Sequence, residues 1–146
     1  MPEFRGVHHV KIPVTDLGTS TEWYRKVFGL DVAVRFEDSD GVVRGVMLGT
    51  PGEVFGLALR ESPDHARGIA DWDPVAYLAE DEAEVEAWAA HLDGLGIAHS
   101  PVIRTHIGAL LVFRDPDGIE VRFYSGAQPA DDFGATIRPG RPPPPG

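Results

Sequence analysis

Two apolar runs of this sequence carry side chains that could bind or transform a small molecule. His9 and Lys11 alternate with apolar residues in an early run. Glu120 and Arg122 alternate with apolar residues in a late run. Imidazole and carboxylate groups are ligands for divalent metal ions and can also act as general acids and bases. Together the four side chains could fix the orientation of a ligand in a largely apolar pocket.

The composition limits the classes of function. At 146 residues the chain suits one domain with a sizeable core, and 23 acidic residues against 13 basic ones give a net charge of −10. This charge repels phosphate backbones and anionic lipids, so we expect no nucleic-acid or membrane partner. The sequence shows no leader pattern and no apolar run of ~20 residues, so we expect a cytoplasmic protein. The absence of cysteine excludes thiolate metal sites and cysteine nucleophiles.

Hydrophobic periodicity and turn residues predict several strands and two helices. Residues 7–14 are rich in β-branched types and indicate a strand, followed by a helix that Thr19 and Glu22 cap and Gly29 ends. The second helix begins at Asp81 and carries apolar residues at helical spacing. We predict the remaining strands at 31–37, 42–49, 53–60, 73–79, 97–103, 107–114 and 119–125.

An internal repeat indicates how these elements are organised. A shift of 65 positions superimposes the two halves without a gap, placing Val10 on Val75, Asp16 on Asp81, Trp23 on Trp88, Gly29 on Gly94 and Pro51 on Pro116. The fold class is therefore α+β, with two tandem βαβββ modules. We predict one domain at 5–125, with module one at 5–62 and module two at 70–125. The proline-rich tail at 126–146 is predicted to be disordered.

Each strand should turn one face to the helices and the other face to a hollow. The alternation assigns to the helix side Val10, Ile12, Val14, Val75, Tyr77, Ala79, Val121 and Phe123. It assigns to the hollow His9, Lys11, Phe55, Leu57, Leu59, Pro74, Ala76, Leu78, Glu120, Arg122 and Tyr124. We therefore predict a ligand site lined by His9, Lys11, Phe55, Leu57, Pro74, Glu120 and Arg122.

Three stretches, in this order and spacing, resemble the vicinal-oxygen-chelate superfamily, also called the glyoxalase, bleomycin-resistance and extradiol-dioxygenase group. They are residues 9–17, residues 23–30 and residues 113–120 with their Asp-Pro-Asp-Gly turn. With the repeat, the resemblance covers residues 5–125. It implies paired modules that form a curved eight-stranded cavity for a small-molecule ligand or substrate, and a homodimer. It does not fix the reaction, because one fold hosts many functions.

The resemblance also implies four positions for metal ligands, one on the first and one on the last strand of each module. In this sequence they fall on His9, Phe55, Pro74 and Glu120. Phenylalanine and proline offer no donor, and a catalytic divalent metal generally needs about three protein ligands. We therefore expect no metal cofactor; a divalent ion, if bound, would be held by His9 and Glu120. Asp73 is an alternative ligand, although a one-residue slip turns it to the other strand face.

Two functions of different classes follow from this pattern. The first is a binding protein that holds a largely apolar or aromatic molecule without metal, as antibiotic-sequestering members of the group do. The second is an enzyme, either a metal-dependent lyase, isomerase or dioxygenase, or a metal-free acid/base catalyst. In the metal-free enzyme, Glu120 would abstract a proton and His9 would stabilise or protonate the substrate oxygen. The sequence alone leaves both functions open.

Overall fold

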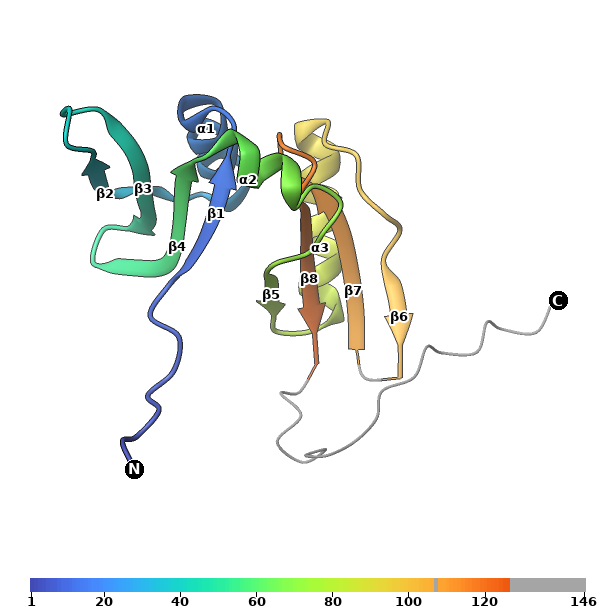
Figure 1. The fold of residues 1–146 in the computed structure, drawn as a ribbon. Coiled ribbons are helices and arrows are strands. Elements are labelled where there is room, and N and C mark those ends of the chain that lie inside the picture. The colour runs from blue at the N-terminus through green and yellow to red at the C-terminus, as the bar shows by residue number, and fades with distance from the viewer. Residues whose placement is uncertain (107, 127–146) are drawn as a thin grey trace, which may run out of the picture. The chain divides into compact units, whose positions relative to one another are not determined.

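The computed structural model describes residues 1–106 and 108–126, except the side chains of Val54 and Phe55. The elements are, in chain order (Figure 1), β1 (Val10–Val14), α1 (Leu17–Phe28), β2 (Asp31–Glu37), β3 (Val43–Thr50), β4 (Glu53–Glu61), α2 (Pro63–Gly68), β5 (Ala76–Ala79), α3 (Glu82–Leu95), β6 (Ile103–Thr105), β7 (Gly108–Arg114) and β8 (Glu120–Ser125). They form two four-stranded sheets, ordered β1-β4-β3-β2 and β5-β8-β7-β6. The predicted α+β class and the two tandem βαβββ modules are confirmed.

The chain divides into two compact units. Met1–Val75 and Arg114–Glu120 form the first, and the described residues of Ala76–Phe113 and of 121–126 form the second. The predicted curved cavity involves both units together and stays a prediction. The predicted tail disorder concerns residues 127–146, which lie outside the described residues. In the described ranges, no helix is long and apolar enough to cross a membrane.

The core of the first unit lies between α1 and one face of the first sheet. Cross-strand register aligns Ile12 with Leu59 and Leu59 with Val46, so apolar side chains form a continuous row across three strands. The buried residues that build this core are Ile12, Val14, Leu17, Tyr24, Val27, Val46, Leu48, Leu57 and Leu59. Burial of this apolar surface is the main force that holds α1 to the sheet.

The second unit is built around aromatic side chains. Phe123 on β8 stacks on Trp88 of α3, with ring centroids 4.3 Å apart, and on Phe113 of β7 at 6.1 Å. The helix starts where the Asp81 side chain accepts the Glu84 N–H and ends at Gly96, whose φ of 69° is left-handed. The predicted start of this helix is therefore confirmed, and the helix ends at Leu95 with Gly96 as its C-cap.

Four predicted boundaries were wrong for local reasons. The first helix is capped by Asp16, which accepts the Thr19 N–H, so it begins earlier than the predicted Thr19 cap. The strand predicted at 97–103 fails because Pro101 has no N–H, and β6 forms only after it. Pro74 shortens the strand predicted at 73–79 in the same way. The first strand begins at Val10 rather than at residue 7.

The two modules are offset by one residue in their last strands. Ile12 pairs with Leu59, whereas Tyr77, its counterpart in module two, pairs with Phe123. Leu59 and Phe123 are 64 positions apart, not the 65 positions of the repeat. The offset coincides with a bulge of β4, because Gly49 pairs with Val54 while the adjacent Leu48 pairs with Leu57, so that the pairing skips Phe55 and Gly56.

This offset reverses one predicted sheet face. The register places Leu57 and Leu59 level with Val10 and Ile12, on the face that packs on α1. The prediction that Leu57 and Leu59 face the ligand hollow was therefore wrong. Within the repeat, the counterpart of Glu120 is Gly56 rather than Phe55, because a gapless shift does not account for the bulge.

Gly56 is the residue that makes this bulge possible. Its φ of 67° is left-handed, and a Cβ built on it would lie 3.1 Å from the His8 carbonyl oxygen. We expect Gly56→Ala to lower the free energy of unfolding by about 2 kcal/mol, measured by urea denaturation. Gly52→Ala is the matched control, because Gly52 also has a positive φ but has nothing within 4 Å of an added Cβ. Equal losses in both variants would contradict the role of the close contact.

Candidate functional site

The face of the first sheet that points away from α1, here called the open face, carries two cross-strand rows of side chains. The first row runs from β2 to β1 through Val34, Met47, Ala58 and Lys11. The second runs in the same direction through Phe36, Gly45, Arg60 and Pro13. Apolar residues therefore occupy the β2 and β3 side of the open face, and two cations occupy the β1 and β4 side.

A cavity lies at the cationic side of the open face. Its volume is about 470 Å³, and it is lined by Lys11, Pro13, Arg60, Glu61, Ser62 and His65. β1 and β4 supply Lys11 and Arg60, while the Ser62 Oγ lies 2.6 Å from the His65 Nδ1 where α2 begins. Lys11 and Arg60 make no ion pair with any residue of the described part of the chain.

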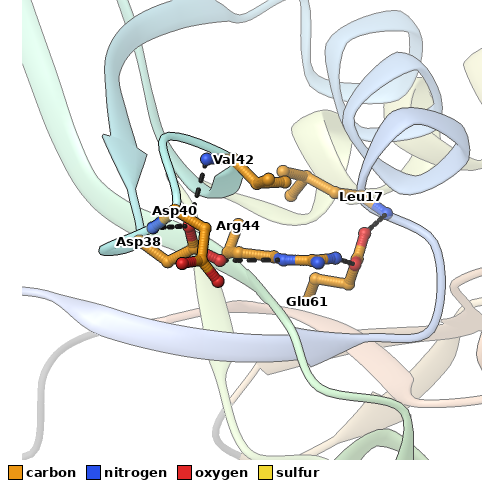
Figure 2. Close-up of polar contacts among 6 residues, drawn as sticks. All are labelled: Leu17, Asp38, Asp40, Val42, Arg44 and Glu61. Carbon is orange, nitrogen blue, oxygen red and sulfur yellow. Dashed lines mark hydrogen bonds and ion pairs between the residues drawn. The ribbon is translucent and has the colours of Figure 1, made fainter.

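Glu61 is the acidic residue of this lining, and its carboxylate is held by other partners (Figure 2). One oxygen forms an ion pair with Arg44, and the other accepts the Leu17 N–H at 3.3 Å. Arg44 also contacts Asp38 at 3.4 Å, and the hydrogen bond to Glu61 raises the pKa of the guanidinium. This network joins β3 and β4 to the start of α1, so Glu61 supports the cavity wall rather than neutralising Lys11 or Arg60.

Asp38 anchors the other end of the same network. Its Oδ1 accepts the Asp40 N–H at 2.9 Å and the Val42 N–H at 3.0 Å, which shapes the turn between β2 and β3 (Figure 2). The Val42 N–H is the main cause that lowers the pKa of Asp38. The carboxylate therefore stays ionised and keeps Arg44 aligned towards Glu61.

His9 lies directly before β1 and is exposed. Its Nδ1 is 2.9 Å from the Nδ1 of His8, and its backbone lies beside Gly56 of β4. No hydrogen bond or ion pair joins His9 to Glu120 among the described residues. The first-module ligand positions are thus His9 and a glycine, which has no donor, and the side chain of the predicted Phe55 lies outside what the structure describes.

Glu120, at the start of β8, lies near the segment that precedes β5. Its N–H donates to the Trp72 carbonyl at 2.9 Å, and Asp73 directly follows Trp72. The β5–β8 register pairs residues 46 positions apart and, extended by two residues, places the exposed Pro74 opposite Glu120. The Glu120 side chain is 16% exposed, and its Oε1 is 3.4 Å from Arg114 Nη2. The backbone of Glu120 therefore lies close to both Asp73 and Pro74.

Within residues 1–106 and 108–126, no group of three His, Asp or Glu side chains is arranged to hold a metal ion. Gly56 and Pro74 cannot ligate, so the donor set does not fit a catalytic divalent metal.

Arg122, which was predicted to bind the ligand, lies in the second unit. It is half-buried and pairs in register with Ala76, and it does not line the cavity of the first unit.

Comparison with known proteins places the chain in a family. The family model described as the Glyoxalase/Bleomycin resistance protein/Dioxygenase superfamily matches residues 6–123. The chain belongs to this superfamily. The assignment confirms the resemblance predicted from residues 9–17, 23–30 and 113–120. Members of this superfamily bind small-molecule ligands or substrates. The predicted small-molecule partner is therefore confirmed at the level of the family.

Solved structures of proteins with different functions share this fold. The antibiotic binding protein TnmS3 from Streptomyces sp. CB03234 is 20% identical, with a TM-score of 0.68, over 87% of this chain and 100% of that chain. A glyoxylase/bleomycin resistance protein/dioxygenase domain from Frankia sp. EAN1pec is 26% identical, with a TM-score of 0.68, over 86% and 100%. The fosfomycin resistance protein FosX from Listeria monocytogenes is 16% identical, with a TM-score of 0.64, over 86% and 96%. The first and third of these likenesses establish the fold alone.

In this superfamily member, sequence reasoning found part of the site and missed part. Lys11 was predicted and lines the cavity, whereas Arg60, Ser62 and His65 were not predicted. Arg60 alternates with the helix-facing Leu59, so the correct face of β4 would have placed it beside Lys11. Ser62 followed by Pro63 is typical of a helix start and could have predicted α2, which carries His65.

Proposed function

We propose that this superfamily member is a small-molecule-binding protein that holds a largely apolar or aromatic ligand on its open face without a metal ion. The supporting observation is the apolar half of that face. Val34 and Phe36 are 40% and 46% exposed, although both are large apolar side chains. Met47 continues this surface towards β4. Apolar side chains beside a cavity with a few polar groups are typical of a ligand site.

The available donor groups support the metal-free part of the proposal. Of the four ligand positions, Gly56 and Pro74 carry no donor atom, which leaves His9 and Glu120 as the two donors, and no group of three His, Asp or Glu side chains in the described residues could hold a metal ion. Two ligands leave most of the coordination shell of a divalent ion to water. The apolar ligand would therefore be held by burial of its surface, at roughly 25 cal/mol per Å².

A titration of chelator-treated protein with naphthalene-2-carboxamide, a neutral aromatic probe, tests this proposal. We expect saturable binding by calorimetry, with at least a tenfold weaker affinity in Val34→Asp, because a carboxylate on the open face opposes an apolar ligand. Val42→Asp is the matched control, since Val42 is similarly exposed in the turn between β2 and β3. Absence of saturable binding to the wild-type protein would contradict the proposed function.

An enzyme is the second candidate, and the place of Asp73 favours it. Asp73 directly follows Trp72, whose carbonyl accepts the Glu120 N–H, so the second module has two carboxylates near the position where the resemblance implies one ligand. A lactoylglutathione lyase from Agrobacterium tumefaciens is 22% identical, with a TM-score of 0.66, over 86% of this chain and 96% of that chain. If probe binding requires a divalent ion and is lost after chelation, the enzyme becomes the better candidate.

The remaining features follow from the superfamily resemblance. We propose a cytoplasmic homodimer, as the sequence suggested.

A further inference from the structure

We infer that the ligand carries an anionic group, and that Lys11 and Arg60 bind this group in the cavity between β1, β4 and α2. This inference rests on the proposed function, which concerns the apolar part of the same ligand. It names the chemical class of the ligand: an amphiphile with an aromatic or apolar body and a carboxylate, phosphate or sulfonate.

The two cations converge because of strand register. Arg60 pairs with Pro13 across the parallel β1–β4 pair, and Lys11 lies two residues before Pro13 on the same face. Both side chains line the cavity of about 470 Å³. Gly45 contributes space beside them, since a Cβ added there would lie 3.6 Å from Arg60 Cδ and 3.8 Å from Phe36 Cβ.

The charges around the cavity leave these cations available. Glu61 is engaged by Arg44 and the Leu17 N–H. Asp64, at the start of α2, forms an ion pair with Arg67. No described carboxylate is paired with Lys11 or Arg60, in a chain whose net charge is −10. An anion bound here would replace water around two cations and gain charge-assisted hydrogen bonds.

Two further polar side chains complete the anion site. The Ser62 hydroxyl and the His65 imidazole, 2.6 Å apart, line the same cavity. A hydroxyl can turn its hydrogen towards a bound oxygen anion. The apolar rows through Val34 and Phe36 begin on the same face, two strands away, so one molecule can place its charge on β1 and β4 and its apolar body on β2 and β3.

Two matched probes and one ion test the inference. We expect naphthalene-2-carboxylate to bind at least tenfold more tightly than naphthalene-2-carboxamide, and we expect the double variant Lys11→Ala/Arg60→Ala to abolish this preference. We also expect inorganic phosphate at constant ionic strength to shift the amide resonances of Lys11 and Ser62 saturably in the wild type but not in the double variant. Arg35→Ala is the matched control, because its register with Val46 places this cation on the opposite sheet face.

The outcomes separate this inference from the proposed function. Equal binding of the two naphthalene probes, with no saturable response to phosphate, would overturn the anion site and leave the apolar site intact. A phosphate response that disappears in the double variant, without binding of the neutral probe, would support the anion site and contradict the proposed function. A phosphate response that persists in the double variant would also overturn the inference.

Discussion

Gly108→Ala is expected to prevent the second sheet from folding. Gly108 has a φ of 149°, a conformation that residues with a side chain rarely adopt. A Cβ at this position would collide with the Ser125 carbonyl oxygen and lie 2.8 Å from its carbonyl carbon. The neighbouring Ala109 N–H donates to the Ser125 Oγ at 2.9 Å, so β7 cannot move away without losing this bond. We expect a loss of at least about 4 kcal/mol in the free energy of unfolding, measured by urea denaturation.

Gly94→Ala, in the same unit, is expected to raise stability rather than lower it. Gly94 lies inside α3, and nothing is within 4 Å of a Cβ added there. Alanine in a helix interior is more favourable than glycine by roughly 1 kcal/mol, so this variant should be slightly more stable than the wild type. If the free energy of unfolding of Gly108→Ala lies within about 1 kcal/mol of the wild-type value, the close contact between Gly108 and Ser125 does not determine the stability of the second sheet.

Hydrophobic periodicity and the repeat together predict the architecture, because both report burial. Tyr77, Val121 and Phe123 lie on the predicted helix-facing side of the second sheet. Ile12, the counterpart of Tyr77 in the first module, is buried on the corresponding side of the first sheet. The bulge at Gly56 could not be read from periodicity, because an inserted residue changes the register without changing the pattern of apolar residues. The one-residue offset between the two modules explains why Leu57 was assigned to the wrong face.

The candidate site shows the same limit. Lys11 follows from alternation along β1, which lies within the strand predicted at residues 7–14. Arg60 becomes a neighbour of Lys11 only through the parallel register of β1 and β4, which depends on the bulge. His65 lies on α2, a single short helix that buries only Ala66 and therefore has almost no periodic signal. Tertiary pairing, rather than local pattern, creates the cationic cavity.

Asp115 is a buried carboxylate whose role is structural, and its replacement should have the second large effect. It is 5% exposed and accepts three hydrogen bonds, from the Tyr24 hydroxyl at 2.9 Å, the Asp117 N–H at 2.9 Å and the Ile119 N–H at 3.0 Å. These bonds hold the Asp-Pro-Asp-Gly turn that leads into Glu120. We expect Asp115→Ala to lower the free energy of unfolding by about 2–4 kcal/mol, because buried donors lose their acceptor.

Asp115→Asn should instead reveal the ionisation of this carboxyl group. Burial raises its pKa, so the folded chain binds the proton more tightly than the unfolded chain, where an aspartate pKa is about 3.9. The contribution of the group to stability is therefore complete below about pH 4 and is lost as the pH rises through the raised pKa. Asparagine does not titrate and can still bond Tyr24, Asp117 and Ile119. The stability of Asp115→Asn relative to wild type should thus increase with pH across this window.

Tyr24→Phe tests the direction of the same linkage. The Tyr24 hydroxyl donates to Asp115 and lowers its pKa, opposing the effect of burial. Without this hydrogen bond the pKa of Asp115 should rise further, and the loss of stability should extend to higher pH, in addition to a cost of about 1 kcal/mol for the bond. Urea denaturation of wild type, Asp115→Asn and Tyr24→Phe from pH 3 to pH 8 measures both effects. A stability difference between Asp115→Asn and wild type that stays constant or decreases as the pH rises would show that Asp115 is not destabilised by ionisation in the folded chain.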